Sequence, residues 1–406
     1  MTIEVGRYLG QDGVWLKNSK TRLFVQQFGG MTPDFSRRIT IDECEQWVNT
    51  HWNPHFKAPF SGKLDAQSEE QAAYWGIELM RQAAGTFPCA PTFGPGNEQL
   101  LPHGDTANHD WQLEQAKLSD DGVACVQWSL VGSYKGLRYQ KWDLLRASDS
   151  AHYMVLEISN PGSVPVQANM AWHTTLGALF LERGCYIASN CHKYKVAPAG
   201  TEFDTTSRLA ADAEFTCLSA APGKSGRDRD LSLMPGYNGC AEFVSGVTHH
   251  RDYLWSVCAN PYLNLAYLSL IPFSALEGQV NASSMNYWIH TGGREFAPWA
   301  DYDGGSDRNY ALGMECAVGA SCLGLDESTQ LDNYMGKPAH HTIGVGETVC
   351  FPCINSLFDL DPELFADGLS AEATRLRLHQ AVEAHIATLD LNFSAFKALH
   401  KHKKDD

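Results

Sequence analysis

Residues 124–173 read ACVQWSLVGSYKGLRYQKWDLLRASDSAHYMVLEISNPGSVPVQANMAWH. Four strand-like runs rich in apolar, β-branched and aromatic residues lie at 124–132, 136–147, 152–159 and 165–173. The segments SYKG, SDSA and NPGSV between them have the composition of turns. Successive runs follow one another at about eight to twelve residues, which is the spacing of an all-β sandwich or barrel. The stretch therefore predicts an antiparallel meander.

Similar strand-like runs continue through the rest of the chain, separated by loops of Gly, Asn, Asp and aromatic residues. They cover residues 240–247, 254–259, 263–273, 284–291, 310–319 and 347–354. We find no internal repeat, low-complexity linker or shift of composition that marks a domain boundary. We therefore predict one large antiparallel β-sandwich domain over residues 1–360, which is large enough to bury a core without disulfides or metal.

Helix signals are few and lie outside these runs. Two capping boxes, Thr40–Glu43 and Ser68–Gln71, predict helical insertions near residues 40–50 and 68–85. Gly85 suits the position just after the second helix. Both helices are expected to decorate the sandwich rather than to form its core.

A third helix is predicted to begin near Ser370. Apolar residues recur after it at the spacing of one helix face, namely Leu378, Val382, Ile386 and Leu389. The last residues, HKHKKDD, have the composition of an exposed and frayed terminus. Residues 361–406 are therefore expected to form a C-terminal helical extension with a frayed tail.

The composition restricts the class of protein. The chain has 406 residues, 44% of them hydrophobic and 19% charged, as in an ordinary globular protein. Its net charge of −16 argues against binding to nucleic acid or to an anionic membrane. No window approaches the roughly eighteen apolar residues of a membrane span, and we see no signal peptide. We expect a cytoplasmic protein, as a monomer or a homodimer.

The 12 cysteines are scattered, and in a cytosolic protein they are expected to be reduced. Cys350 and Cys353 form a C-x-x-C, but no helix start or second pair accompanies it, so we interpret them as buried strand cysteines. The adjacent histidine pairs at 249–250 and 340–341 lack the spacing of metal ligands. We therefore expect neither a metal nor a cofactor.

The strand over 166–173 carries a histidine on its polar face. Side chains on a strand alternate between two faces, so Val166, Ala168, Met170 and Trp172 share an apolar face. His173 shares the opposite face with Gln167, Asn169 and Ala171. A single histidine on a strand is more often structural than functional, so His173 needs partners elsewhere in the chain.

Two other segments offer such partners. The strand-like run NYALGMECAVG places Glu315 on a face whose neighbours, Gly313 and Ala317, are small, which leaves space for a ligand. The loop LPHGDTANHDWQL carries His103 beside a glycine, where a ligand can approach. Together, His103, His173 and Glu315 are two imidazoles and a carboxylate, which is a set suited to acid–base chemistry.

In order and spacing, the segments PHGDTAN, NMAWHTTLG and YALGMEC resemble the motifs of the aldose 1-epimerase (mutarotase) family. The early segment QQFGGMTPDFS is also similar to the first strands of that family, and the resemblance spans residues 20–355. It implies a galactose-mutarotase-like β-supersandwich. The chain departs from the family at Trp172, where better-known members have Asn, and at Cys316, where Pro or Thr is common. These departures indicate a divergent member.

The resemblance also implies a reaction, the interconversion of the α and β anomers of a hexose or hexose derivative without a cofactor. Glu315 would be the base toward the anomeric hydroxyl, His173 the acid toward the ring oxygen, and His103 a hydrogen-bond donor to the sugar. The expected substrate contacts are Trp111, Asn169, Trp299 and Asp301. Trp288 lies inside a strand-like run, so we expect it in the core, and the arginines Arg37, Arg38, Arg294 and Arg308 are expected at the surface.

Other functions remain open at this point. A sandwich of the same kind can bind a carbohydrate without catalysing any reaction, so a non-catalytic binding protein is the main alternative. A polysaccharide lyase would normally have a tyrosine or a second carboxylate as its acid, and usually a secretory signal. An enzyme of the mutarotase type and a carbohydrate-binding protein differ in whether His173 and Glu315 accelerate anomer exchange.

Overall fold

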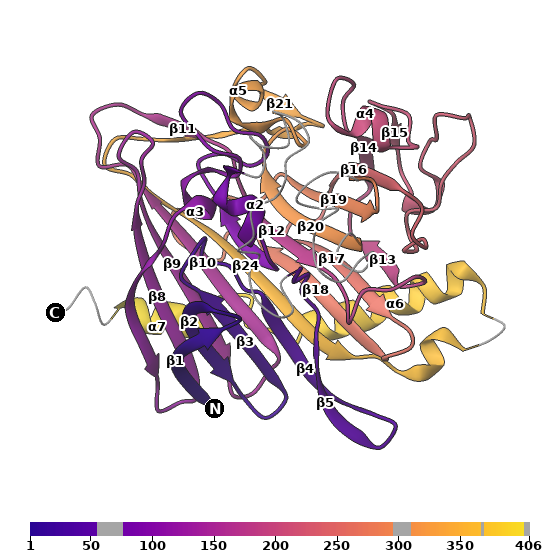
Figure 1. Ribbon diagram of the computed structural model, residues 1–406, viewed down its shortest axis with the longest axis horizontal. Coiled ribbons are helices and arrows are strands. Elements are labelled where there is room, and N and C mark those ends of the chain that lie inside the picture. Colours follow the sequence, from indigo (N-terminus) through magenta and orange to yellow (C-terminus); the bar gives the residue numbers. More distant parts are fainter. Residues whose placement is uncertain (55–75, 295–309, 367–368, 402–406) are drawn as a thin grey trace.

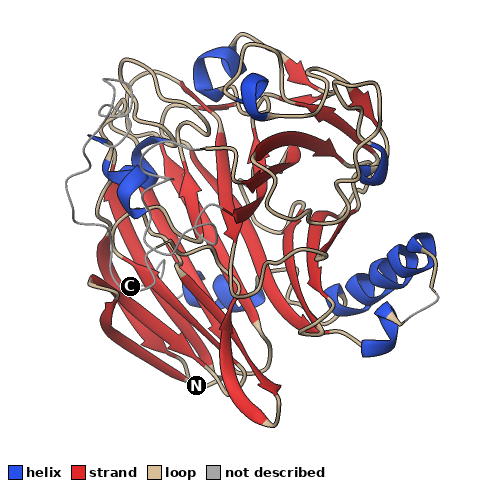
Figure 2. Ribbon diagram, turned by 45° about the vertical axis from the view of Figure 1, so that its right-hand side comes forward, coloured by secondary structure: helices blue, strands red, loops and turns tan. Residues whose placement is uncertain are grey.

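The computed structural model describes residues 1–54, 76–294, 310–366 and 369–401. Strands dominate these residues, and the helices lie at the periphery (Figure 2). Three large antiparallel sheets of eight, seven and five strands enclose one main hydrophobic core (Figure 1). The predicted all-β antiparallel sandwich is therefore confirmed.

The eight-stranded sheet runs in the order β13 (Tyr186–Ser189), β17 (Tyr253–Asn260), β18 (Leu265–Pro272), β24 (Thr348–Asp359), β10 (Ala151–Ser159), β9 (Arg138–Arg146), β8 (Val123–Val131) and β7 (Gln112–Leu118). The seven-stranded sheet runs in the order β15 (Glu214–Phe215), β14 (Lys193–Val196), β16 (Cys240–Val247), β19 (Ser284–Thr291), β20 (Tyr310–Val318), β12 (Met170–Leu176) and β6 (Thr86–Cys89). The five-stranded sheet contains β1 (Thr2–Tyr8), β2 (Gln11–Lys17), β3 (Thr21–Gln26), β4 (Asp34–Ile41) and β5 (Cys44–Asn49). Two small sheets pair β11 (Val166–Ala168) with β23 (His341–Ile343), and β21 (Asn333–Tyr334) with β22 (Lys337–Pro338).

The main core lies between the facing sides of these sheets. Met154 from the eight-stranded sheet, Met314 from the seven-stranded sheet and Val14 from the five-stranded sheet all belong to it and are fully buried. Because strand side chains alternate, the other face of each sheet is left for a second layer. On the seven-stranded sheet, that other face contributes the small cluster around Phe87 and Trp288, where the candidate site lies.

The C-terminal helices cover the outer face of the eight-stranded sheet. Helix α6 (Ala371–Ile386) begins where the sequence predicts, with the Ser370 side chain accepting a hydrogen bond from Ala373 N. The predicted apolar stripe is buried, and it packs on that sheet through Leu378 and Val382 among others. Helix α7 (Ser394–Lys401) follows on the same surface.

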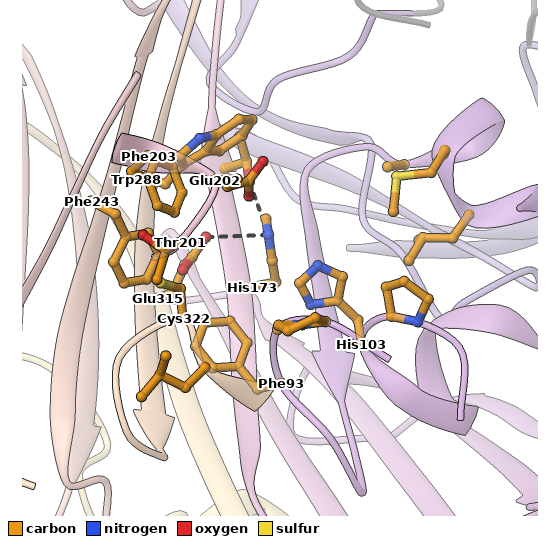
Figure 3. Close-up of a pocket in the computed structure, with 18 of the residues that line it drawn as sticks. Phe93, His103, His173, Thr201, Glu202, Phe203, Phe243, Trp288, Glu315 and Cys322 are labelled. Atoms are coloured by element: carbon orange, nitrogen blue, oxygen red, sulfur yellow. Dashed lines mark hydrogen bonds and ion pairs between the residues drawn. The ribbon is translucent and has the colours of Figure 1, made fainter. Parts of the chain in front are cut away.

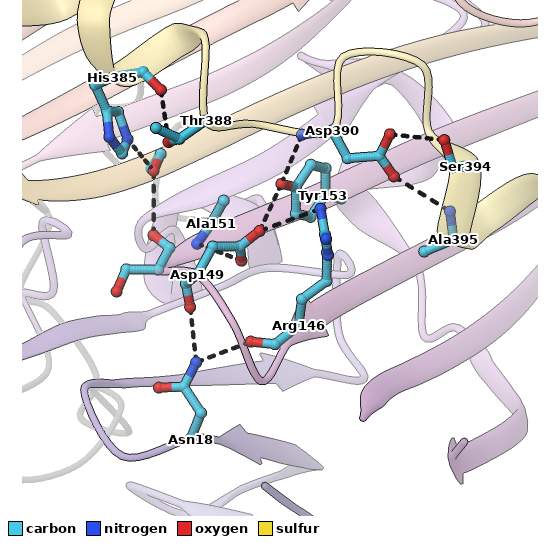
Figure 4. A network of polar contacts seen from close by, with 12 residues as sticks. Asn18, Arg146, Asp149, Ala151, Tyr153, His385, Thr388, Asp390, Ser394 and Ala395 are labelled. Carbon is cyan, nitrogen blue, oxygen red and sulfur yellow. Dashed lines mark hydrogen bonds and ion pairs between the residues drawn. The ribbon is translucent and has the colours of Figure 1, made fainter. Parts of the chain in front are cut away.

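Polar contacts fix this helical layer to the strands below it (Figure 4). Tyr153 Oη on β10 donates to Asp149 Oδ2 at 2.8 Å and accepts from the Asp390 backbone N–H at 3.2 Å. The Asp390 carboxylate accepts from Ser394 Oγ and from Ala395 N, so it caps the start of α7. The C-terminal extension is therefore an integral layer of the sandwich, and its expected frayed tail, residues 402–406, lies outside the described residues.

The predicted helical insertion near 40–50 is wrong. That segment is a hairpin of β4 and β5, in which Thr40 pairs with Glu45 and Ile41 with Cys44. Asp42 and Glu43 both have positive φ, as in the tight two-residue turns that join twisted strands. A capping box needs only two matching residues, whereas the pairing of β4 with β5 extends from Ser36–Asn49 to Ile41–Cys44.

The remaining helices are short and lie in connections. Within the described ranges they are α2 (Glu78–Gln82), α3 (Gly104–Asn108), α4 (Phe203–Thr206), α5 (Gly324–Thr329) and two 3₁₀ turns, Leu218–Ala220 and Pro362–Phe365. Helix α2 falls within the insertion predicted near 68–85, and the Ser68 capping box lies outside the described residues. None of the helices in the described ranges has the length and apolar content needed to cross a bilayer.

None of the twelve cysteines forms a disulfide in the described part of the chain, and Cys350 and Cys353 are buried on β24 as predicted. The first three runs of the predicted 124–173 meander form β8, β9 and β10, which are neighbours in the eight-stranded sheet. The meander is wrong at its last strand, because the fourth run forms β11, paired with β23, and β12, in the seven-stranded sheet. The break between β11 and β12 falls at Asn169, whose side chain turns away from the sheet to bond a neighbouring loop.

Candidate active site

Strands β12 and β20 are neighbours in the seven-stranded sheet and form the floor of the site. Trp172 pairs with Cys316 and Thr175 with Gly313, so this antiparallel register puts His173 opposite Glu315. Trp172 and Cys316 point into the main core, which leaves the histidine and the glutamate on the opposite face. His173 Nε2 lies 3.2 Å from Glu315 Oε1.

Gly313 makes room for the carboxylate. It lies two residues before Glu315 and on the same face of β20. A Cβ at this position would be 2.7 Å from Glu315 Oε1 and 3.0 Å from Trp288 Cβ on the adjacent strand β19. Ala317, on the other side of Glu315, is also small. A larger side chain at Gly313 would therefore collide with the Glu315 carboxylate, which is the steric reason for the small neighbour predicted from the sequence.

His103 approaches from a loop rather than from a strand. It is the residue before α3 and has a left-handed φ of 64°, a conformation that histidine adopts more readily than most residues. Gly104 follows with a φ of 74°, and a Cβ there would be 2.4 Å from the Ala90 carbonyl oxygen. This tight turn brings the His103 ring to 4.9 Å from the His173 ring, at right angles to it.

Aromatic rings hold both imidazoles in place. Phe87 on β6 stacks on His173 with 4.5 Å between ring centroids and 10° between planes. Phe93 lies at 5.9 Å from the His103 ring. Cys89 Sγ is 3.5 Å from His103 Nδ1. Each imidazole is therefore packed on one side and open on the other to the cavity.

The cavity has a volume of about 480 Å³ and is mostly apolar. This volume lies in the range of small-molecule sites. The close-up view shows His173 between Glu315 and His103, with Phe93 beside them and Thr201, Glu202 and Cys322 on the surrounding walls (Figure 3). Further apolar lining comes from Trp52, Leu79, Met80, Phe203, Phe243, Trp288 and Leu323.

Burial shifts the pKa value of each of the three groups in the direction that favours its neutral form. It raises the pKa of Glu315 to about 8, against a smaller lowering by the positive charge of Arg294. It lowers the pKa of His173 well below its usual value, with the nearby His103 ring adding to the effect. It lowers the pKa of His103 to about 4. Near neutral pH the 3.2 Å contact therefore joins a carboxylic acid to a neutral imidazole, and the pair holds one exchangeable proton.

One oxygen of this carboxyl group faces no protein partner. Glu315 is 1% exposed, yet its Oε2 is buried without a hydrogen bond among the described residues. A buried carboxyl oxygen without a partner is costly, and the cost is larger for the ionised form. This oxygen is therefore a second reason for the carboxyl group to keep its proton.

Trp288 and Arg294 line the cavity as well, although neither was predicted there from the sequence. Trp288 was expected in the core and Arg294 at the surface. The Arg294 guanidinium lies 5.2 Å from the Trp288 ring centroid, and its Nη2 lies 2.7 Å from Glu202 Oε2. Trp288 on β19 pairs with Gly313 on β20. Gly313 and Glu315 are on one face of β20, and paired residues share a face, so Trp288 lies on the face of Glu315.

Two other predicted site residues, Trp111 and Asn169, are not among the residues that line the cavity. Trp111 is wholly buried in the main core, where its Nε1 donates to Thr106 O at 2.9 Å, so it is a packing residue and forms no wall. Asn169 is also buried, and its amide bonds the backbone of Phe93 at 2.8 and 3.2 Å. It therefore supports the loop that carries Phe93 and does not face the cavity. Trp299 and Asp301 lie outside the described residues.

Comparisons with known proteins identify the fold. No protein-family model and no curated protein sequence matches the chain. A galactose mutarotase-like protein from Clostridium acetobutylicum superposes with a TM-score of 0.56 at 10% identity, over 88% of this chain and 99% of its own. Candidate aldose 1-epimerases from Klebsiella pneumoniae and Escherichia coli K12 give TM-scores of 0.58 and 0.50 at 11% and 14% identity, over 93% and 88% of this chain and 86% and 100% of theirs. The expected galactose-mutarotase-like fold is therefore confirmed, at a sequence identity of 10–14% to these proteins.

Proposed function

We propose that this protein catalyses the interconversion of the α and β anomers of a hexose or hexose derivative, with His173 and Glu315 as the acid–base pair. The observation that carries the proposal is the 3.2 Å contact between His173 Nε2 and Glu315 Oε1 on the floor of a cavity that admits a small molecule. The shared fold with mutarotase-like proteins supports it.

The reaction needs one acid and one base. The base removes the proton of the anomeric hydroxyl while the acid protonates the ring oxygen, and the bond between C1 and the ring oxygen breaks. Rotation about the C1–C2 bond turns the other face of the aldehyde toward the hydroxyl that the ring oxygen has become. On reclosure the protonated base gives its proton to the new anomeric oxygen and the deprotonated acid takes the proton of the attacking hydroxyl, so no cofactor is consumed and the pair ends with the charge it had at the start.

The single proton of the pair fits this requirement. With the proton on Glu315, the carboxylic acid is the donor and the neutral imidazole of His173 is the base. The resemblance to the mutarotase family implies the opposite starting form, with the proton on His173. A shift of the proton across the 3.2 Å contact converts one form into the other, and the two forms exchange roles during each turnover.

The surroundings strengthen this chemistry. In a cavity with mostly apolar walls, charges that develop on the sugar interact more strongly with nearby groups than they would in water. The His103 ring, 4.9 Å from the His173 ring, is placed to donate a hydrogen bond to a sugar oxygen. The Trp288 ring offers an apolar surface on which a sugar C–H face can pack.

Anomer exchange measured by NMR tests the proposal. Purified protein would be added to freshly dissolved α-glucose, α-galactose and a set of modified or anionic hexoses, with Glu315→Gln and the exposed Glu98→Gln as a matched pair of variants. We expect faster exchange on at least one sugar, a loss of about a hundredfold or more in Glu315→Gln, and no loss in Glu98→Gln. Saturable sugar binding without faster exchange would instead identify a carbohydrate-binding protein.

A further inference from the structure

We propose that Thr175 is a positioning residue that holds the ring hydrogen of His173 on Nδ1. The other nitrogen, Nε2, which faces Glu315, is then free to accept a proton. Thr175 Oγ1 lies 3.0 Å from His173 Nδ1, and the two residues are next-but-one neighbours on β12, so their side chains leave the same face. The consequence for catalysis rests on the proposed function, whereas the protonation state of the ring does not.

Thr175 is held rigidly by its backbone. Its N–H donates to the Gly85 carbonyl at 3.1 Å, and its own carbonyl accepts from Trp52 N at 2.9 Å. The residue is 1% exposed. Its β-branched side chain has few rotamers, so the hydroxyl is fixed next to the histidine and does not have to be ordered by the substrate.

The imidazole ring is fixed as well. Phe87 stacks on one face of the His173 ring. The two nitrogens of His173 have separate partners, Thr175 at Nδ1 and Glu315 at Nε2. A flip of the ring would exchange these partners. The tautomer of a histidine is set by the hydrogen bond that its other nitrogen makes, so the group at Nδ1 controls the state of Nε2.

A hydroxyl suits both states of the pair, because it can donate and accept. While Glu315 carries the proton and donates it to Nε2, the neutral ring keeps its hydrogen on Nδ1, and Thr175 Oγ1 accepts it. When Nε2 takes the proton from the carboxyl group or from a substrate, the ring becomes an imidazolium and the same Nδ1–H···O bond stabilises its charge. When the pair loses its proton altogether, the ring hydrogen moves to Nε2 and the hydroxyl donates to Nδ1.

The titratable and charged groups around His173 come from several elements. They are Glu315 on β20, His103 before α3, Cys89 on β6 and Arg294 after β19. Of these, Glu315 contacts Nε2, whereas Thr175 contacts Nδ1. A change at Thr175 therefore acts on the ring through a different nitrogen from every change at Glu315.

The first test does not depend on any sugar. Protein with ¹⁵N-labelled histidine would be compared as wild type, Thr175→Val, Thr175→Ser and Thr174→Val, because a protonated ring nitrogen and a bare one have well-separated ¹⁵N shifts. We expect wild-type His173 at pH 6–7 to carry its hydrogen on Nδ1, Thr175→Val to lose this preference and Thr175→Ser to keep it. Thr174 has the same side chain on the opposite face, bonded to Thr86, so Thr174→Val is the matched control and should leave the ring unchanged.

The second test uses anomer exchange. Thr175→Val should lower kcat by about tenfold to a hundredfold, as loss of a partner behind a functional histidine typically does, with little change in KM, and Thr175→Ser should restore most of it. A wild-type ring with its hydrogen on Nε2 at pH 6–7, or a Thr175→Val ring identical to wild type, would overturn the proposal. If no sugar is turned over, the ¹⁵N result still decides the role of Thr175, so the two failures are distinguishable.

Discussion

Glu315→Gln should change how the stability of the protein depends on pH. Burial raises the pKa of Glu315 from its ordinary 4.5 to about 8. The folded protein therefore keeps a proton that the unfolded chain releases as the pH rises above about 4.5. The resulting stability is fully present below that pH and is lost as the pH rises toward and through 8.

The structure sets the size of the effect. Each unit of pKa difference is worth about 1.4 kcal/mol, so the full shift corresponds to a loss of up to about 5 kcal/mol of unfolding free energy between pH 4.5 and 9. Glutamine has the same shape and cannot ionise. Between pH 5 and 8 the wild-type stability should therefore fall relative to that of Glu315→Gln, with a slope of up to about 1.4 kcal/mol per pH unit.

Urea unfolding of both proteins at pH 5, 6, 7, 8 and 9 measures this difference, and other titrating groups cancel because the two chains share them. The exposed Glu98→Gln should follow the wild type. A constant difference between wild type and Glu315→Gln across this range would mean that Glu315 is already ionised in the folded protein at neutral pH. In that case the description of a neutral carboxylic acid beside His173 would be wrong.

Three further changes test other parts of the structure. The rate of anomer exchange should stay constant through neutral pH and fall about tenfold per pH unit above pH 8, where the pair of His173 and Glu315 loses its proton. A rate that keeps rising to pH 10 would contradict a pair that works by sharing one proton. Gly313→Ala should lower kcat by about tenfold or more with the fold retained, because the new methyl group displaces the Glu315 carboxylate, and circular dichroism with kinetics would separate the two effects. Trp111→Phe should lower the free energy of unfolding in urea by about 1–3 kcal/mol and leave the KM for sugar unchanged, because Trp111 packs in the main core. A raised KM would mean that Trp111 contacts the sugar after all.

The sequence predicts most of the strands, because alternation and turn composition are local signals. The faces of β12 and β20 follow in the same way, with Trp172 and Cys316 in the core and His173 and Glu315 opposite. The hairpin at 40–50 was missed because the capping box at Thr40 uses two residues, whereas the pairing of β4 with β5 extends over their length. Local signals that compete over one segment are decided by the longer pattern.

The site was predicted in part. A sequence can show that His103, His173 and Glu315 suit one reaction, but only the fold brings a loop and two strands to one cavity. Asn169 was assigned to the polar face of a continuous strand, and the break in that strand turns its amide toward the Phe93 backbone. Trp111 follows a loop that does reach the cavity, yet its ring packs into the core. Such errors arise because the partners of a side chain, such as the Phe93 backbone for Asn169, are set by the fold and not by the segment that carries the side chain.

Strand β24 is the last strand along the chain, yet it lies inside the eight-stranded sheet, between β18 and β10. During folding, the edges of these two strands have no partner until residues 348–359 arrive between them. Contacts of such large sequence separation form slowly, and unpaired edges invite association between chains in the meantime. The order of the strands thus makes closure of the main sheet a late event, and the interval before it is when the chain is most prone to aggregate.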